Sequence, residues 1–485
     1  MNLSSAIRLE AWAAKPVIAL IGAGGKSTLL FRLGNELAQA GYQTLLSTTT
    51  KLGAHQVDDA AFTLLASDPQ LLARELPTSL RGYRQVLALS GEAPGGKVLG
   101  LPPEIICQLL GLADVQAVVV EADGSRRRPI KAPADHEPVV SACTNHMLTV
   151  AGMAGIGKPL SADWVHRPAL VASLTGLSMG EPLTPEAVAA LLTHPRGGAK
   201  GGPEQARKFL YLNLTSSVNK PCERANQLTA AREIADLVIA TQVNDSGAVD
   251  DMALSGQGHQ AVLIGNARGD DPVIEVYGSV VAIVLAAGEG GRMGPNRVKQ
   301  LLPWGAGNTL VGHVADTALA ARLIQRVVVV LGYQAGAVEE SLGERPVARA
   351  ENPEWQRGQS SSVRAGLQTA LASMPNLSGA IFLLADQPDV LPNTIDLLVE
   401  AHRRTLASIV VPRYQGGARG NPVLFDRRVF PQLMSLAGDT GGRALFDDYG
   451  DAVQSVPIEQ AAPRGIESWE DYRRRTGAID GEGRQ

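Results

Sequence analysis

Cysteine and aromatic residues are scarce in this 485-residue chain, and neither sign of charge dominates it. The cysteines Cys107, Cys143 and Cys222 show no CxxC pairing and no metal-ligand spacing, so we expect core thiols in a reducing compartment. Because the net charge is -4, the protein has no overall excess of positive charge that would indicate nucleic acid or an anionic membrane surface as a partner. No apolar run approaches the roughly 18 residues of a membrane span, and the N-terminus lacks a basic n-region, so we expect a cytoplasmic protein.

The length and the hydrophobic pattern together predict two α/β domains. A single core stops growing at roughly 250 to 300 residues, so this chain needs more than one. Short apolar runs alternate with amphipathic stretches, which is typical of mostly parallel sheets flanked by helices. The clearest runs, each expected to form a strand, are residues 17–21, 115–120, 237–240, 280–286, 327–331 and 381–384. The polar segment 266–279 predicts a linker between domains at 1–265 and 280–475, with a flexible tail at 476–485.

A glycine-rich turn follows the run that begins at Val280, in the stretch VVAIVLAAGEGGRMG. Glycines after a buried strand let backbone N–H groups surround phosphate oxygens, while Arg292 adds a forked donor and Lys299 a point charge. Taken alone, such a loop is equally consistent with an ordinary βα turn. The run 381–384 ends in ADQP, where Asp386 either starts a turn or holds magnesium on a nucleotide's phosphates. The loop and the aspartate together favour a magnesium-dependent nucleotide site.

The motifs LAAGEGGRMG, KQLLPW, LLADQP, RGNPVLF and GDTGGRAL resemble those of the MocA-like molybdenum cofactor nucleotidyltransferases, within the MobA-like group. The resemblance implies a Rossmann-like nucleotidyltransferase fold of the nucleotide-diphospho-sugar transferase type. It also implies transfer of CMP, or GMP, from CTP or GTP to molybdopterin phosphate, with release of pyrophosphate. The residues it implies for catalysis are Arg292, Lys299 and Asp386. Those implied for the triphosphate are Leu285, Ala286, Ala287, Gly288, Gly291, Arg292 and Lys299, and those for the substrate are Asn421, Asp439 and Arg443.

Two departures from that family concern Lys299 and the second metal ligand. Four residues, rather than two, separate RMG from Lys299, which would displace this lysine and let Arg297 share its task. Glu467 stands near the place of an aspartate that assists the metal in the family, so we expect it to ligate magnesium together with Asp386. The four-residue spacing also resembles cytidylyltransferases that act on sugar-like or methylerythritol phosphates. A non-catalytic, nucleotide-gated cofactor carrier is a further alternative.

A second phosphate-binding loop is predicted near the N-terminus, where the run 17–21 leads into GAGGKST and then into an amphipathic stretch. In a strand, loop and helix of this kind, backbone N–H groups, the helix dipole and a lysine meet the phosphates. The residues predicted to bind ATP or GTP are Gly22, Gly24, Gly25, Lys26, Ser27 and Thr28. Ser27 can ligate magnesium, and Glu121 or Asp123, after the run 115–120, can hold magnesium or order a water. The residues 48–51, TTTK, either contact the γ-phosphate or simply complete a strand.

The motifs GAGGKST, STTTK, EADGSRRRPIKAPADHEP, GKPL, HRP and HPRGGAKGGP are similar, in order, to those of the YqeC family of selenium-dependent molybdenum hydroxylase accessory proteins. This resemblance covers residues 15 to about 265 and implies a P-loop-like nucleotide-binding domain. Of a base-reading Asn-Lys-x-Asp motif, only the asparagine, Asn213, is present, so the sequence does not decide which purine is bound. Two domains of one pathway in a single chain suggest that one loads or gates the product of the other. The expected partners are the molybdenum cofactor and a molybdenum hydroxylase apoenzyme.

Overall fold

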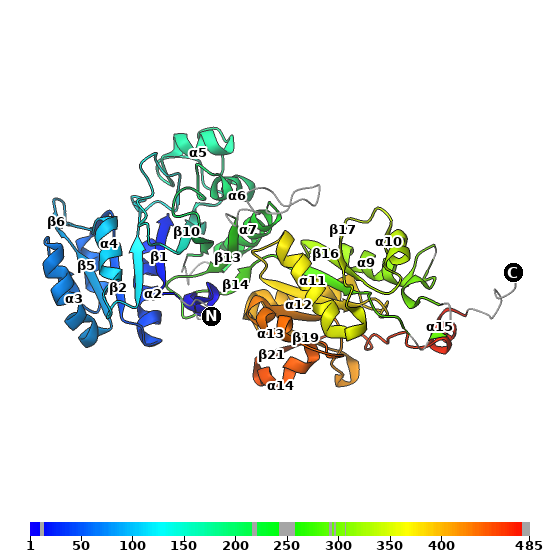
Figure 1. Cartoon of the computed structure of the whole chain (residues 1–485). Coiled ribbons are helices and arrows are strands. Elements are labelled where there is room, and N and C mark those ends of the chain that lie inside the picture. Colours follow the sequence, from blue (N-terminus) through cyan, green and yellow to red (C-terminus); the bar gives the residue numbers. More distant parts are fainter. Residues whose placement is uncertain are drawn as a thin grey trace. The chain divides into compact units, whose positions relative to one another are not determined.

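A computed structural model describes residues 1–9, 14–215, 221–241, 258–290, 293–294, 297–305 and 307–477. These residues fall into two compact units, the first ending at Tyr277 and the second starting at Gly278 (Figure 1). Within this part of the chain, no helix combines the length and the apolar character needed to cross a membrane. From residue 478 onward, the predicted tail lies outside the described residues.

The first unit is built around a nine-stranded, almost entirely parallel sheet. Its strands are β1 (Val17–Gly22), β2 (Thr44–Thr48), β4 (Thr63–Leu65), β5 (Gln85–Leu89), β8 (Ala117–Glu121), β10 (His146–Gly152), β12 (Arg207–Asn213), β13 (His259–Gly265) and β14 (Glu275–Tyr277). Their order is β14-β13-β12-β10-β1-β8-β2-β5-β4, and β14 runs antiparallel to β13 while the other neighbours are parallel. The turn after β1 therefore opens at the carboxyl edge of the sheet, where such folds bind ligands.

Helices cover both faces of this sheet because successive strand residues point to opposite sides. Leu45 of β2 packs with Leu76 of α3 (Pro69–Tyr83) and Ile106 of α4 (Pro103–Leu110). The next residue, Leu46, lies instead against Gly34 of α2 (Lys26–Gln39). The unit also contains α1 (Leu3–Ala6), α5 (Pro168–Thr175), α6 (Pro185–Thr193), α7 (Pro221–Ala240), and the short strands β3 (Lys51–Gly53), β6 (Gly91–Ala93), β7 (Lys97–Leu99), β9 (Ile130–Lys131) and β11 (Val165–His166).

The residues 237–240, which we expected to form a strand, are the last turn of α7. The buried residues of this helix include Ala231, Ile234, Ala235 and Val238, which recur at intervals of one, three and four. That spacing places them along one face of a helix. The short apolar run is therefore the end of a helical stripe, and the expectation of a strand is wrong.

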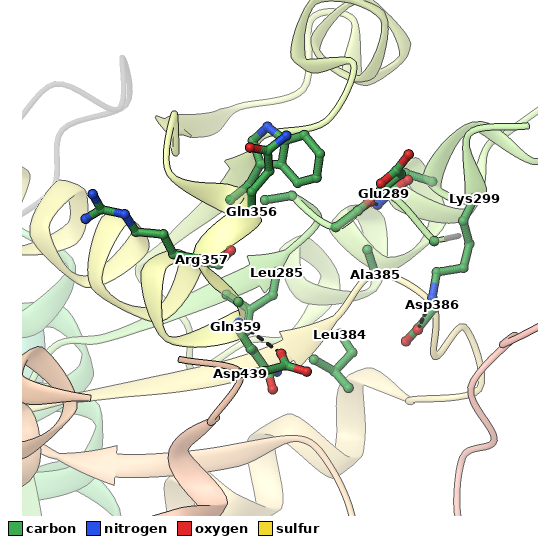
Figure 2. A pocket seen from close by; sticks show the side chains of 17 residues that line it. Leu285, Glu289, Lys299, Gln356, Arg357, Gln359, Leu384, Ala385, Asp386 and Asp439 are labelled. Atoms are coloured by element: carbon green, nitrogen blue, oxygen red, sulfur yellow. Dashed lines mark hydrogen bonds and ion pairs between the residues drawn. The ribbon is translucent and has the colours of Figure 1, made fainter. Parts of the chain in front are cut away.

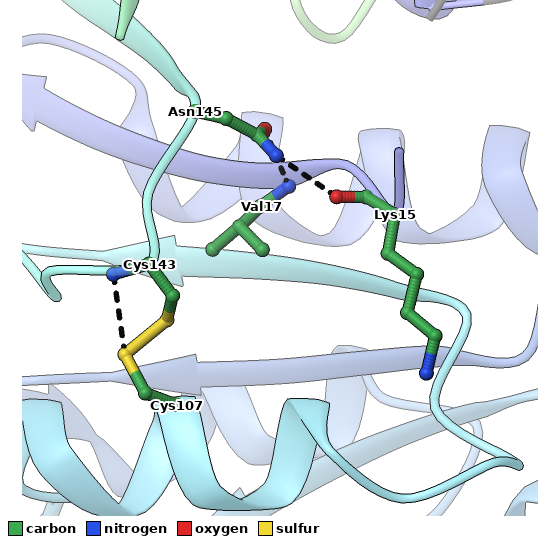
Figure 3. Close-up of a disulfide and its surroundings, with 5 residues drawn as sticks. All are labelled: Lys15, Val17, Cys107, Cys143 and Asn145. Carbon is green, nitrogen blue, oxygen red and sulfur yellow. Dashed lines mark hydrogen bonds between the residues drawn. A yellow bond between two sulfur atoms is a disulfide. The ribbon is translucent and has the colours of Figure 1, made fainter. Parts of the chain in front are cut away.

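A disulfide joins Cys107 of α4 to Cys143, which lies just before β10 (Figure 3). The expectation that these cysteines are core thiols is therefore wrong, and Cys222 is free but exposed. The pair has a sequence separation of 36 residues and is brought together only when β10 pairs with β1. Beside it, the Oδ1 atom of Asn145 accepts a hydrogen bond from the backbone N–H of Val17 at 2.9 Å, which fixes the start of β1 (Figure 3).

The second unit contains a seven-stranded sheet in which every pair of neighbours is parallel except those that include β20. Its strands are β15 (Val280–Leu285), β16 (Arg326–Leu331), β17 (Val347–Glu351), β18 (Gly379–Leu384), β19 (Ile409–Arg413), β20 (Val423–Asp426) and β21 (Val453–Pro457). They follow the order β17-β16-β15-β18-β20-β19-β21, with β20 antiparallel to both neighbours. Leu285 and Leu384 are register partners, so the carboxyl ends of β15 and β18 lie side by side.

Helices flank this sheet on both faces as well. Val284 of β15 belongs to the same core cluster as Val314 of α9 (Leu310–Ala320) and Leu398 of α12 (Pro392–Thr405). The preceding residue, Ile283, packs on the other face with Leu367 of α11 (Gln359–Ser373). The remaining helices are α10 (Ala335–Leu342), α13 (Phe430–Ser435), α14 (Phe446–Tyr449) and α15 (Trp469–Thr476). The two units confirm the predicted α/β class with mostly parallel sheets between helices.

The boundary between the units, at Tyr277 and Gly278, lies near the end of the segment 266–279 that the sequence indicates. Strand β14 pairs with β13, and Arg232 of α7 donates two hydrogen bonds to the carboxylate of Glu275. Residues 266–277, expected as part of a linker, therefore belong to the first unit. Only residues 278 and 279 remain between β14 and β15, both of which lie in the described part of the chain.

Candidate nucleotide sites

A cavity of about 510 Å³ opens at the carboxyl ends of β15 and β18 in the second unit (Figure 2). Its wall is formed by the glycine-rich turn after β15, by the short 3₁₀ helix η5 (Lys299–Leu301), and by the turn after β18. The segment that leads into α11 completes it. This is the edge of a parallel sheet at which nucleotides and other small ligands bind.

Lys299 and Asp386 form an ion pair in the wall of this cavity (Figure 2). The Nζ atom of Lys299 donates to Oδ2 of Asp386 at 2.6 Å, and the two side chains are 18% and 22% exposed. The other carboxylate oxygen, Oδ1, is buried and accepts no hydrogen bond from any described residue. Because a buried oxygen without a donor is costly, this atom offers a ligand position to a cation. The two residues meet despite the four-residue spacing after RMG.

The glycine-rich turn packs closely against η5. The Nε2 atom of Gln300 donates to the carbonyl of Gly288, and a Cβ on Gly290 would lie 3.0 Å from Cβ of Lys299. Gly290 also has a φ of +66°, which glycine adopts without strain. Of the residues predicted for the triphosphate, those in the cavity wall are Leu285, Ala287, Gly288 and Lys299. Ala286 is buried in the core, and Gly291 and Arg292 lie outside the described residues.

One part of the wall, the segment from Trp355 to Ser362, was not predicted from the sequence. Here the 3₁₀ helix η6 (Trp355–Arg357) and Gly358 lead into α11, which begins at Gln359. The first backbone N–H groups of this 15-residue helix already have acceptors, because those of Gln359, Ser360 and Ser361 donate to Asp439, Gly438 and Gly358. The sequence signal was the glycine in front of Gln-Ser-Ser-Ser, which starts this helix without a capping side chain of its own.

Of the three residues predicted to bind substrate, Asp439 lies in the cavity wall and the other two do not. Oδ1 of Asp439 accepts a hydrogen bond from the backbone N–H of Gln359 at 3.2 Å and so caps α11 (Figure 2). Nδ2 of Asn421 donates to Oε1 of Gln387 at 3.1 Å, and Arg443 is exposed. Asp439 therefore has a visible positioning role, whereas substrate contacts of Asn421 and Arg443 stay predictions.

The C-terminal segment connects the loops that carry Lys299 and Asp386. The backbone N–H of Ile466 donates to the carbonyl of Asp386 at 2.9 Å, and the hydroxyl of Tyr472 in α15 donates to the carbonyl of Pro303 at 2.7 Å. Arg297 lies over the ring of Trp469, 4.1 Å from its centroid, and is absent from the cavity wall. The expectation that Arg297 shares the task of Lys299 is therefore wrong, because its guanidinium anchors α15 instead.

Glu467, predicted as the second metal ligand, is exposed and follows a segment that lies against Asp386. A Cβ on Gly465 would lie 3.7 Å from Cγ of Glu467 and 3.9 Å from Oδ1 of Asp386. The described residues contain no group of three or more His, Cys, Asp or Glu arranged to hold a metal ion. Magnesium characteristically binds through one or two carboxylates with substrate phosphates and water, and Asp386 with its unpaired Oδ1 fits that pattern.

The first unit holds its predicted phosphate loop at the carboxyl end of β1, and α2 begins directly after it at Lys26. Gly22, Gly24 and Gly25 have φ angles of +91°, +84° and +134°. A Cβ on Gly24 would also lie 2.6 Å from Cα of Gly152 in β10. The glycines are thus required both by backbone conformation and by close packing.

Lys26 contacts the two carboxylates that the sequence singled out. Its Nζ atom lies 3.2 Å from Oδ1 of Asp123 and 3.7 Å from Oε1 of Glu121, and donates to the carbonyl of Gly22 at 2.7 Å. The hydroxyl of Ser27 donates to Oε2 of Glu121 at 2.7 Å. Burial raises the pKa of Glu121, although Lys26 and Ser27 oppose this shift. The loop, its lysine, its serine and both carboxylates therefore form one cluster, while Thr28 occupies the first turn of α2.

The ion pairs of this cluster continue into the unit. Nζ of Lys131 lies 2.8 Å from Oδ2 of Asp123 and 2.7 Å from Oε2 of Glu137, and Arg167 donates two hydrogen bonds to Glu137. Burial by itself raises the pKa of Glu137, but the hydrogen bonds and charges of Arg167 and Lys131 outweigh it and lower this pKa to about 2. Glu137 is therefore a carboxylate at every ordinary pH.

Asn213 supports the phosphate loop. Its Nδ2 atom donates to the carbonyl of Gly24 at 2.6 Å, and its Oδ1 atom accepts from the backbone N–H of Ala267 at 3.0 Å. A Cβ on Gly25 would lie 2.3 Å from that Nδ2 atom. This asparagine, expected as part of a base-reading motif, thus fixes the loop from the end of β12.

The fold and the cavity of the second unit define a nucleotidyltransferase. Residues 282–453 match the model of the MobA-like NTP transferase domain, and residues 18–169 match the model of the YqeC protein. The substrate of the second unit is accordingly a nucleoside triphosphate.

Similar proteins are known for both parts of the chain. Over 211 residues it is 34% identical to the uncharacterized protein YqeC of Escherichia coli (strain K12), and this match covers 43% of this chain and 78% of that protein. Over 174 residues it is 34% identical to the nicotine blue oxidoreductase of Paenarthrobacter nicotinovorans, and this match covers 34% of this chain and 81% of that protein. The crystal structure of Rv0371c from Mycobacterium tuberculosis H37Rv aligns with a TM-score of 0.36 at 28% identity, over 41% of this chain and 98% of that one. The chain belongs to the YqeC family and to the MobA-like NTP transferase family, which confirms the predicted fusion.

Proposed function

We propose that the second unit transfers CMP or GMP from CTP or GTP to the phosphate of molybdopterin, releases pyrophosphate, and depends on magnesium. The observation that carries this proposal is the ion pair of Lys299 and Asp386 in the wall of a cavity of about 510 Å³. A nucleotide fits a cavity of this size, since small-molecule sites measure roughly 300 to 1,000 Å³. Similarity to the MobA-like domain supports the choice of acceptor.

The chemistry needs no nucleophile from the protein, because the acceptor phosphate attacks the α-phosphorus and pyrophosphate leaves. Lys299 would turn from Asp386 to the phosphates, and the turn at Gly288 and Gly290 would present backbone N–H groups to them. Magnesium, when bound, neutralises charge on the triphosphate, and Asp386 would hold it with Glu467 close by.

We further propose that the first unit binds ATP or GTP with magnesium through the loop 22–28, Glu121 and Asp123. The glycine conformations, the position of the loop directly before α2 and the cluster around Lys26 support this role. Both units would serve maturation of one cofactor for a molybdenum hydroxylase apoenzyme in the cytoplasm, and the first would load or gate the product of the second.

The test is pyrophosphate release by the full chain with magnesium, molybdopterin and either CTP or GTP. We expect release with one nucleotide, a loss of at least about 100-fold in Asp386→Ala, and little change in Lys26→Ala. Asp447→Ala, which changes an exposed aspartate outside the cavity wall, is the matched control. No release with either nucleotide, while magnesium and nucleotide still bind, would support a non-catalytic carrier. Release with 2-C-methyl-D-erythritol 4-phosphate in place of molybdopterin would support the sugar-phosphate alternative.

A further inference from the structure

A second cavity, of about 420 Å³, lies in the first unit at the carboxyl ends of β2, β4 and β5. Its volume is within the range of small-molecule sites. Part of its lining is apolar and comes from α3, from α4 and from the residues just before α4, with Leu72 and Leu101 almost fully buried. The polar residues that line it are Thr49, Thr50, Lys51, Ser67 and Ser90.

Three of the hydroxyl groups in this lining already donate a hydrogen bond to another group of the protein. The hydroxyl of Thr49 donates to the carbonyl of Val139 at 2.7 Å, and that of Ser90 donates to the carbonyl of Gly100 at 2.7 Å. Thr50 shares a hydrogen bond of 3.1 Å with the hydroxyl of Thr48. The hydroxyl of Thr48 donates its single hydrogen bond to the carbonyl of Glu121 at 2.8 Å, so Thr50 is the donor in the bond between the two threonines.

A hydroxyl group has one proton and two lone pairs, so these three groups can only accept further hydrogen bonds. A ligand that contacts them must supply N–H or O–H donors. Lys51 has the opposite requirement, because it is exposed and makes no ion pair with any described residue. Its ammonium group can donate only, and it favours an anion.

We propose that this cavity binds a small organic acid whose apolar ring carries N–H or O–H donors. The ring would pack on Leu72 and Leu101, its donors would meet the hydroxyl groups, and its anionic group would reach Lys51. Inorganic phosphate is a poor match, because it makes no contact with the apolar lining and because the three hydroxyl groups have no hydrogen bond left to donate to it.

The cavity lies on the same sheet edge as the phosphate loop. Thr48 and Glu121 are register partners, and the backbone N–H of Thr49 donates to the carbonyl of Glu121 at 3.0 Å. Strand β8 alone separates β2 from β1, so the strand ends are about 10 Å apart. The first unit would thus present two ligand sites side by side, although the inference depends neither on nucleotide binding nor on the transferase.

Saturation-transfer NMR with 4-aminobenzoate on the full chain tests the proposal. This probe has a flat ring, N–H donors and a carboxylate, whereas benzoate lacks the donors and aniline lacks the anion. We expect Lys51→Ala to weaken binding of 4-aminobenzoate at least fivefold, and Ser67→Trp, which fills the cavity from an exposed position, to remove it. Lys97→Ala and Ser173→Trp, at exposed positions outside the lining, should leave it unchanged.

Two outcomes would overturn the proposal. One is no binding of 4-aminobenzoate by the wild type, and the other is equal binding by wild type, Lys51→Ala and Ser67→Trp. If benzoate binds as tightly as 4-aminobenzoate, the N–H donors do not contribute to binding. If aniline binds as tightly, the anionic group does not contribute, and either result would refute the proposal.

Discussion

Removal of the Lys299 side chain should strengthen the binding of a divalent cation to Asp386 while it weakens the transferase reaction. The ammonium lies 2.6 Å from Oδ2 of Asp386, so its positive charge opposes a metal ion that approaches the unpaired Oδ1 of the same carboxylate. In the absence of a nucleotide, a metal ion must therefore compete with the lysine. With a nucleotide present, the phosphates would draw Lys299 away and the two cations would cooperate.

The exposure of the ion pair sets the size of the effect. The side chains of Lys299 and Asp386 are 18% and 22% exposed, so water screens the pair substantially. An ion pair of this kind contributes about 1 kcal/mol. A metal ion that no longer meets the charge of the lysine should therefore bind about fivefold more tightly, since about 1.4 kcal/mol corresponds to a tenfold change.

The assay is a titration of the full chain with Mn²⁺, in which electron paramagnetic resonance reports the free ion. Lys26 faces carboxylates in the first unit too, so Asp386→Asn must be measured alone and combined with Lys299→Ala to isolate the second site. We expect Lys299→Ala to bind Mn²⁺ about fivefold more tightly than wild type, and to release pyrophosphate at least about 100-fold more slowly. Lys97→Ala is the control. Unchanged or weaker Mn²⁺ binding by Lys299→Ala would refute the reasoning.

Gly24→Ala should abolish ATP binding by the first unit, because the new Cβ would lie 2.6 Å from the backbone of β10; calorimetric titration checks this, with Gly82→Ala as control. Trp469→Ala should lower kcat/KM for pyrophosphate release about tenfold, since Arg297 loses the ring that anchors its loop; unchanged kinetics would contradict this. Glu137→Gln should destabilise the first unit by about 2 kcal/mol near pH 7. Its lowered pKa of about 2 makes this stabilisation complete above pH 4.5 and lost as the pH falls toward 2, so urea unfolding near pH 3 should show a much smaller difference.

The sequence predicted the parts of the fold and site that depend on local pattern. The runs at 280–286 and 381–384 are short, apolar and bounded by turn residues, and they overlap the neighbouring parallel strands β15 and β18. Two loops at the ends of adjacent parallel strands must share one edge of the sheet. The meeting of Lys299 and Asp386 follows from that geometry, whatever the spacing after RMG.

Contacts between distant segments could not be predicted in the same way. The start of α11 enters the cavity wall only because Gly358 packs on the backbone of Asp439, which lies 81 residues further along the chain. The same holds for the disulfide and for Asn213, whose partner Gly24 lies 189 residues away. No periodicity or motif near these residues indicates such partners, because they are chosen by tertiary packing.

The position of β14 has a practical consequence for anyone who separates the two units. A fragment that ends at residue 265 would keep β13 but lose the strand that covers it, so the backbone N–H and carbonyl groups of Val262 to Ile264 would face solvent at a long parallel edge. Such an edge recruits other chains and aggregates, whereas a short antiparallel strand at the rim prevents this. A fragment that ends at Tyr277 should therefore be monomeric and soluble where the shorter one precipitates, and size-exclusion chromatography of both would show it.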